Sequence, residues 1–203
     1  MVFDNNSREH LFDNPSELQK IFIKRRSFRK YMKKPVEKEK ILNIQKTCDI
    51  FIEKSGFCHS IIHITEVADE FNRIVDSATK GFLGKVNPWL KKTDADRLIL
   101  AMADMTGINT DSERLKIIAE TSILMQIAIL RATELGLATC WMTGVNLSEI
   151  EKSIDIKKDV EIIAISTLGY PPESSGLTDY DFWANRLLSS KRKPLSAFIL
   201  NDE

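Results

Sequence analysis

Apolar residues recur along this chain in two periods, one typical of helices and one typical of strands. The longest helical pattern covers residues 112–135, where apolar side chains return every three or four positions over a wide arc. An arc of this width predicts burial on two sides, either at the centre of the core or in a homodimer interface. Gly136 follows directly and is expected to end the helix.

Shorter patterns complete the expected secondary structure. Asn14 is the expected cap of a first short helix, with Pro15 at its first position and Glu17 bonding back to the cap. Helical spacing continues over 37–48 and 70–79, and Asn146 is a further cap signal. Apolar runs, several of them β-branched, predict strands over 60–67, 97–103, 138–142 and 161–168. Because helices and strands alternate, the class is α/β or α+β.

Composition and charge narrow the class of protein. A chain of 203 residues with 43% hydrophobic and 29% charged residues fits one globular domain, which we expect to span residues 1–203. The 29 basic and 29 acidic residues balance, so no overall positive field exists to hold nucleic acid. The first ten residues are polar and no apolar run approaches the length of a membrane span, which predicts a cytoplasmic protein without a membrane partner.

The positive charge is concentrated locally. Residues 24–34 carry seven basic side chains and no acidic one. Within them, Arg25, Arg26, Ser27 and Arg29 offer guanidinium groups and a hydroxyl that suit phosphate oxygens. A second basic cluster, residues 191–193, could converge on the same phosphate. Each cluster taken singly is more typical of a solvated surface.

Other familiar sites are not indicated. The sequence has neither a glycine-rich dinucleotide loop nor a P-loop, and it has no hydrolase triad. His59 and His63 would stand about 13 Å apart in an extended strand, too far to share one metal ion, so we expect no metal site. The three cysteines are scattered and suit reduced thiols, and Cys58 is expected to be a small buried apolar group. Residues 81–92 have the composition of an ordered loop or lid.

The end of the strand predicted over 138–142 is a second candidate site. Thr143 and Gly144 would expose a hydroxyl and backbone N–H groups just before the helix capped by Asn146. Such an edge can bind a heteroatom of a ligand, and a simple turn explains it equally well.

Four segments in this order resemble the nitroreductase family of FMN-dependent oxidoreductases. They are Arg25-Arg26-Ser27-Phe28-Arg29, then Gly136 to Trp141 with Thr143-Gly144, then Leu168-Gly169-Tyr170-Pro171, and finally Arg192-Lys193-Pro194-Leu195. The resemblance implies an α+β, three-layer fold with a central, mainly antiparallel sheet flanked by helices. It also implies an intertwined homodimer with FMN at the interface.

The resemblance also implies roles for individual residues. Arg25, Ser27 and Arg192 correspond to groups on the FMN phosphate, with Arg26 and Lys191 as their neighbours. Arg29 corresponds to the basic side chain beside the flavin pyrimidine ring. Thr143 and Gly144 correspond to groups near flavin N5. No side-chain acid or base is implied, so no catalytic residue is assigned.

The activity implied is transfer of electrons from NADH or NADPH through flavin N5 to a small acceptor such as a nitroaromatic or a quinone. One departure keeps an alternative open. Family members often carry an Asn-x-Gln-Pro-Trp-like run before the first central strand, and Ser55-Gly56-Phe57-Cys58-His59 stands here instead. The alternative is an FMN-binding carrier, sensor or cofactor-processing protein that does not turn over nicotinamide.

Overall fold

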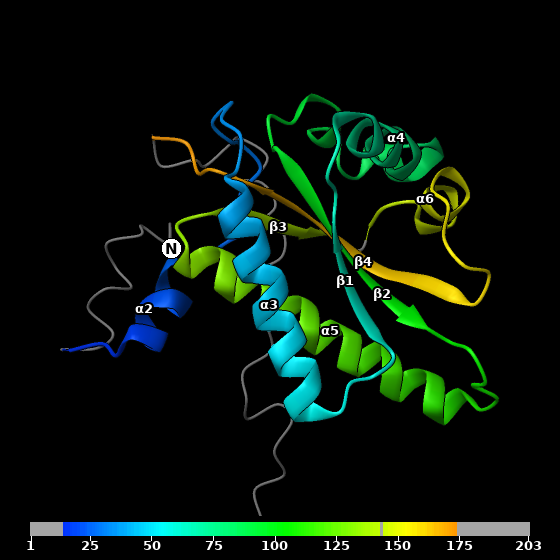
Figure 1. Cartoon of the computed structure of the whole chain (residues 1–203). Coiled ribbons are helices and arrows are strands. Elements are labelled where there is room, and N and C mark those ends of the chain that lie inside the picture. The colour runs from blue at the N-terminus through cyan, green and yellow to red at the C-terminus, as the bar shows by residue number, and fades with distance from the viewer. Residues whose placement is uncertain (1–13, 143, 174–203) are drawn as a thin grey trace, which may run out of the picture.

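Four strands form one antiparallel sheet in the computed structural model, which describes residues 14–142 and 144–173 (Figure 1). Their order across the sheet is β1-β2-β4-β3, so β1 and β3 are its edges. Each neighbouring pair is antiparallel. The strands are β1 (Ser60–Ile64), β2 (Arg97–Asp104), β3 (Ala138–Met142) and β4 (Val160–Gly169).

Helices cover both faces of this sheet. The helices are α2 (Glu17–Lys24), α3 (Lys38–Ser55), α4 (Ala68–Ala78), α5 (Asp111–Glu134) and α6 (Leu147–Ser153). In Figure 1, α3 and α5 cross one face, while α4 and α6 lie together away from them. Two short 3-10 helices, η1 (Gly81–Lys85) and η2 (Leu90–Lys92), follow α4. This three-layer arrangement around an antiparallel sheet confirms the expected α+β fold.

The alternation of side chains along β2 explains the two faces. Leu98 and Leu100 pack into the core under α4 and α6, whereas Ile99 and Ala101 pack into the core under α3 and α5. Successive residues of a strand point to opposite faces, so a strand covered on both sides needs an unbroken apolar run. All four of these side chains are fully buried.

Two helix boundaries differ from the sequence-based expectation. The cap of α2 is Ser16 rather than Asn14, because the Ser16 and Gln19 side chains bond reciprocally to each other's backbone N–H. Helix α3 continues past Cys48 to Ser55. It ends at Gly56, whose φ of 73° lies in the left-handed region that favours glycine.

Helix α5 buries one side and leaves apolar residues on another. Its buried face lies against the sheet and α3 and comprises Ile117, Thr121, Leu124, Met125, Ala128, Ile129 and Ala132. Leu115 and Ile123 remain 65% and 47% exposed. The described chain therefore covers only part of the arc for which burial on two sides is predicted. Within the described ranges, no helix is long and apolar enough to cross a bilayer.

Candidate functional site

The first basic segment is attached to the free edge of β3. Helix α2 ends at Lys24, and Arg25 continues in an extended conformation. Ser27 then forms a parallel bridge with Thr139, and the Phe28 N–H donates to the Thr139 carbonyl at 2.9 Å. The backbone therefore holds these arginines against the sheet.

Two polar atoms in this region are buried and lack a hydrogen-bond partner among the described residues. They are Nε of Arg25 and Oγ1 of Thr139. Burial lowers the pKa of Arg25, and the neighbouring Cys140 partly offsets this effect. A buried donor without an acceptor is costly, so both atoms point to a bound group that supplies acceptors. An anion would satisfy the Arg25 guanidinium best.

Thr139 is not among the site residues predicted from the sequence. The signal that could have indicated it is a single hydroxyl within the otherwise apolar strand Ala138–Met142. The residue is 2% exposed, so its side chain cannot reach bulk water. A hydroxyl at such a position normally has a partner.

The other residues of the basic segment differ in their surroundings. The Arg26 guanidinium lies 4.3 Å from the centre of the Phe28 ring in a cation–π contact. Ser27 and Arg29 are half-buried. The hydroxyl of Tyr31 donates to the Phe28 carbonyl at 2.6 Å, which braces the segment from its C-terminal side.

Gly144, directly beyond β3, is held from a different part of the chain. Nδ2 of Asn87 donates to the Gly144 carbonyl at 2.9 Å, and Oδ1 of Asn87 accepts from Nε1 of Trp89 at 3.2 Å. A Cβ added at Gly144 would lie 3.2 Å from Cγ1 of Val86. Residues 81–92 therefore pack directly against the end of β3.

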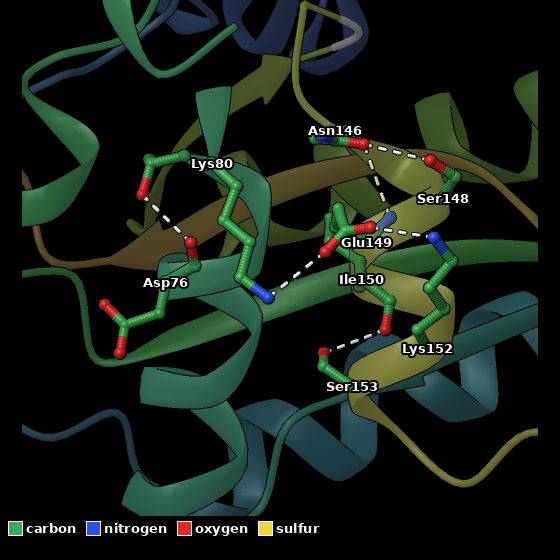
Figure 2. A network of polar contacts seen from close by, with 9 residues as sticks. Asp76, Lys80, Asn146, Ser148, Glu149, Ile150, Lys152 and Ser153 are labelled. Carbon is green, nitrogen blue, oxygen red and sulfur yellow. Dashed lines mark hydrogen bonds and ion pairs between the residues drawn. The ribbon is translucent and has the colours of Figure 1, made fainter. Parts of the chain in front are cut away.

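A polar network fixes the chain after this point (Figure 2). The Asn146 side chain caps α6 by accepting from the Glu149 N–H, as predicted, and the Asn146 N–H donates to the Ala78 carbonyl. Glu149 pairs with Lys152 at 2.8 Å and with Lys80 at 3.1 Å. These two lysines lower the pKa of Glu149. The network ties α6 to the C-terminal end of α4.

The structure thus brings two of the predicted site segments, the basic segment around Ser27 and the turn at Gly144, to the same strand, β3. The segment around Ser27 pairs with Thr139 near the start of β3, and Gly144 follows its end. Thr139 and Met142 are three residues apart, about 10 Å along an extended strand. A ligand with an anionic group at one end and a hydrogen-bonding ring at the other would have to span this distance. Thr143, Lys191 and Arg192 lie outside the described residues.

The segment that departs from the family pattern lies elsewhere. Ser55 ends α3, and residues 56–59 lead into β1, at the opposite edge of the sheet from β3. Three strand spacings separate the two edges, or about 14 Å. Within one chain, Ser55 therefore does not stand beside the Arg25–Ser27 segment.

The histidines and cysteines have separate environments. Nδ1 of His59 contacts the Asp104 carbonyl at 2.8 Å, and Nε2 of His63 contacts Glu70 at 2.6 Å.

The expectation that Cys58 is buried is wrong: this side chain is exposed, because it lies in the turn after α3 and not in the strand. Cys48 is buried, and burial raises the pKa of its thiol to about 12.

Solved structures show the same fold. A nitroreductase family protein from Clostridium difficile 630 is 22% identical, with a TM-score of 0.66 over 93% of this chain and 99% of the other. An FMN-dependent nitroreductase from Clostridium difficile R20291 is 24% identical, with a TM-score of 0.60 over 85% and 95%. A protein from Desulfovibrio desulfuricans, named as a nitroreductase and solved in complex with FMN, is 15% identical. Its TM-score is 0.68 over 94% and 99%.

Sequence comparison agrees with the structural one. No curated protein sequence matches this chain. The model of the nitroreductase family matches residues 65–170, more than half of the chain, from the end of β1 to the end of β4. The chain therefore belongs to the nitroreductase family.

Proposed function

We propose that this protein is an FMN-dependent oxidoreductase that passes electrons from NADH or NADPH to a small acceptor such as a nitroaromatic or a quinone. The observation that carries the proposal is the pair of buried polar atoms, Nε of Arg25 and Oγ1 of Thr139, without partners among the described residues. Both lie where the basic segment joins β3. Two structures of the same fold have names that include FMN.

The residues present fit the phosphate of FMN. A phosphate monoester carries about −1.5 to −2 charges and three acceptor oxygens. Arg25 supplies a charged donor, and Ser27 and Thr139 supply hydroxyls on adjoining backbone. Arg192 is assigned to the same phosphate, with Arg26 and Lys191 nearby. These assignments put the anionic end of the cofactor near the start of β3.

The other end of the cofactor is assigned to the exit of β3. Arg29 is assigned to the pyrimidine side of the flavin, and Thr143 with Gly144 to the neighbourhood of N5. When bound, FMN supplies a ring that accepts a hydride and passes electrons on, so the protein needs no side-chain acid or base. The task of these residues is to bind and orient the ring and to tune its reduction potential.

The homodimer is part of the proposal. Leu18 and Phe22 of α2 are 55% and 52% exposed, and Leu115 and Ile123 add exposed apolar surface on α5. Apolar side chains on two helices of the same chain are typical of an interface between subunits.

An absorption spectrum of the purified protein, followed by mass identification of the released chromophore, tests the proposal. We expect a flavin spectrum and the mass of FMN, and oxidation of NADH or NADPH when a quinone or a nitroaromatic is added. A protein that contains no FMN and acquires none contradicts it. The altered segment at residues 55–59 favours one alternative, an FMN-binding carrier, sensor or cofactor-processing protein. That alternative predicts bound FMN with no oxidation of either nicotinamide.

A further inference from the structure

Asn87 is a buried polar residue whose side-chain amide nitrogen and amide oxygen both have hydrogen-bond partners. It is 8% exposed and lies between η1 and η2. Its Nδ2 donates to the Gly144 carbonyl and its Oδ1 accepts from Nε1 of Trp89. Reversing the amide would set two oxygens against each other and two N–H groups against each other, so the partners define its orientation.

Gly144 needs such an external restraint. Glycine has no Cβ and samples a wide range of backbone conformations, so the direction of its peptide groups is set by its surroundings. Asn87 holds the carbonyl, and a Cβ added at Gly144 would lie 3.2 Å from Cγ1 of Val86. Two residues later, the Asn146 N–H bonds to Ala78 at 3.1 Å. Both restraints come from the stretch that includes the end of α4 and the segment after it.

Trp89 keeps Asn87 in place. Its indole is half-buried and packs against the apolar core under α4 and α6, with its N–H directed at Asn87. A rigid aromatic ring therefore orients a buried amide, and the amide orients a glycine carbonyl. This chain of contacts connects residues 81–92 to the backbone beyond β3.

We propose that Asn87 is a positioning residue that fixes the Gly144 carbonyl, and with it the Val145 N–H of the same peptide group, and thereby sets the reduction potential of the bound flavin. The inference rests on the proposed function, which assigns Thr143 and Gly144 to the neighbourhood of N5. N5 of oxidised flavin accepts a hydrogen bond, whereas N5 of reduced flavin carries a hydrogen of its own, so a donor held at N5 favours oxidised flavin and a donor free to turn away favours it less. Loss of Asn87 therefore raises the potential without removing any group assigned to the phosphate.

The test compares Asn87→Ala and Trp89→Phe with the wild-type protein in its FMN-bound form. Equilibrium titration against a reference dye measures the potential. For Asn87→Ala we expect about a tenfold rise in the equilibrium constant of two-electron reduction, or about 30 mV. Trp89→Phe keeps the Asn87 amide but frees its orientation, so a smaller shift in the same direction is expected. FMN affinity should stay close to that of the wild type.

A second readout does not depend on activity or on cofactor. Amide hydrogen exchange of the FMN-free protein should be faster in Asn87→Ala over both 81–92 and 144–147, and unchanged in β1 and β2. The matched control is Asn72→Ala, which removes an exposed asparagine of α4 and should alter neither readout.

The outcomes separate the two proposals. FMN bound to the wild type, with the potential and the exchange at 144–147 unchanged in the variants, overturns the positioning role alone. A wild-type protein that binds no FMN overturns the proposed function and the role of Asn87 with it. If Asn87→Ala does not fold, the reduction potential and the amide exchange at 144–147 are measured on Trp89→Phe instead. Unchanged values of both in that variant overturn the positioning role.

Discussion

Ser27 and Thr139 lie side by side in a parallel bridge, and the N–H of the next residue, Phe28, donates to the Thr139 carbonyl. This pairing joins a basic segment near the N-terminus to the edge strand β3. A guanidinium group on backbone that is held in this way loses less conformational entropy when it binds an anion. The pairing also brings the Thr139 hydroxyl, which has no hydrogen-bond partner among the described residues, to the same stretch.

Arg25→Ala should weaken FMN binding by about 1.5–3 kcal/mol, because it removes a charged, partly buried donor from the phosphate. Fluorescence titration of FMN measures the affinity. Arg73→Ala, at an exposed position of α4, serves as the matched control and should leave the affinity unchanged. Arg192→Ala should behave like Arg25→Ala. Unchanged affinity in both would reject the phosphate assignment.

Thr139→Val should have opposite effects on the free and the bound protein. Without FMN the buried hydroxyl has no partner in the part of the chain that the structure describes, so its removal should stabilise the fold by about 1 kcal/mol. With FMN it loses a hydrogen bond, so affinity should fall by a similar free energy, about 1 kcal/mol. Urea unfolding and FMN titration measure the two quantities.

The control for this substitution is Thr121→Val on α5. The Thr121 hydroxyl is buried but contacts the Ser60 hydroxyl at 2.9 Å, so its loss should destabilise the FMN-free protein by about 1–3 kcal/mol. If Thr139→Val also destabilises the FMN-free protein, the hydroxyl has a partner there and the argument from burial is wrong.

Gly169→Ala should destabilise the fold by about 1–3 kcal/mol through overpacking. A Cβ at this position would lie 2.9 Å from Cδ1 of Tyr31. The ring cannot easily move away, because its hydroxyl is bonded to the Phe28 carbonyl and to Thr167. The urea midpoint measures the effect, and a midpoint equal to that of the wild type would show that the ring yields.

Glu149→Gln should reduce the free energy of unfolding at neutral pH, where the Glu149 carboxylate is charged, and should have little effect at low pH, where it is protonated. Lys152 and Lys80 lower the folded-state pKa of Glu149 from its ordinary value of 4.5. A lowered folded pKa contributes stability that is present above the unfolded pKa and is lost as the pH falls through the folded pKa. Urea unfolding of the two proteins should therefore differ at pH 7 and converge at low pH. An equal difference at every pH would assign the effect to packing.

One thiol per chain should react with a thiol reagent under native conditions. Cys58 is exposed, whereas Cys48 and Cys140 are buried. Burial also keeps Cys48 protonated, since it raises the pKa of that thiol to about 12. Mass spectrometry after brief labelling identifies the residue, and Cys58→Ser should abolish the reaction. Fast labelling of Cys48 would show that α3 opens in the native protein.

Local sequence predicted most of the elements because their patterns are local. The strand over 138–142 has the predicted bounds, and α5 begins and ends within one residue of the prediction. The predicted helix ended at Cys48 and was too short, because Phe51 and Ile52 continue the same apolar spacing and pack against the core under α3 and α5. The cap of α2 was misplaced because Asn14, Pro15 and Ser16 all suit a helix start. The reciprocal bonds of Ser16 with Gln19 decide between them.

Patterns along the chain are enough to predict the order of elements, the family resemblance and the concentration of positive charge in residues 24–34, since each of these depends on neighbours in sequence. The contacts of the folded chain were needed to identify Thr139 as a candidate cofactor-binding residue and to show that Asn87 bonds to the Gly144 carbonyl. Both depend on contacts between segments more than 50 residues apart in sequence. Burial and the absence of a hydrogen-bond partner are properties of such contacts, and no local pattern encodes them.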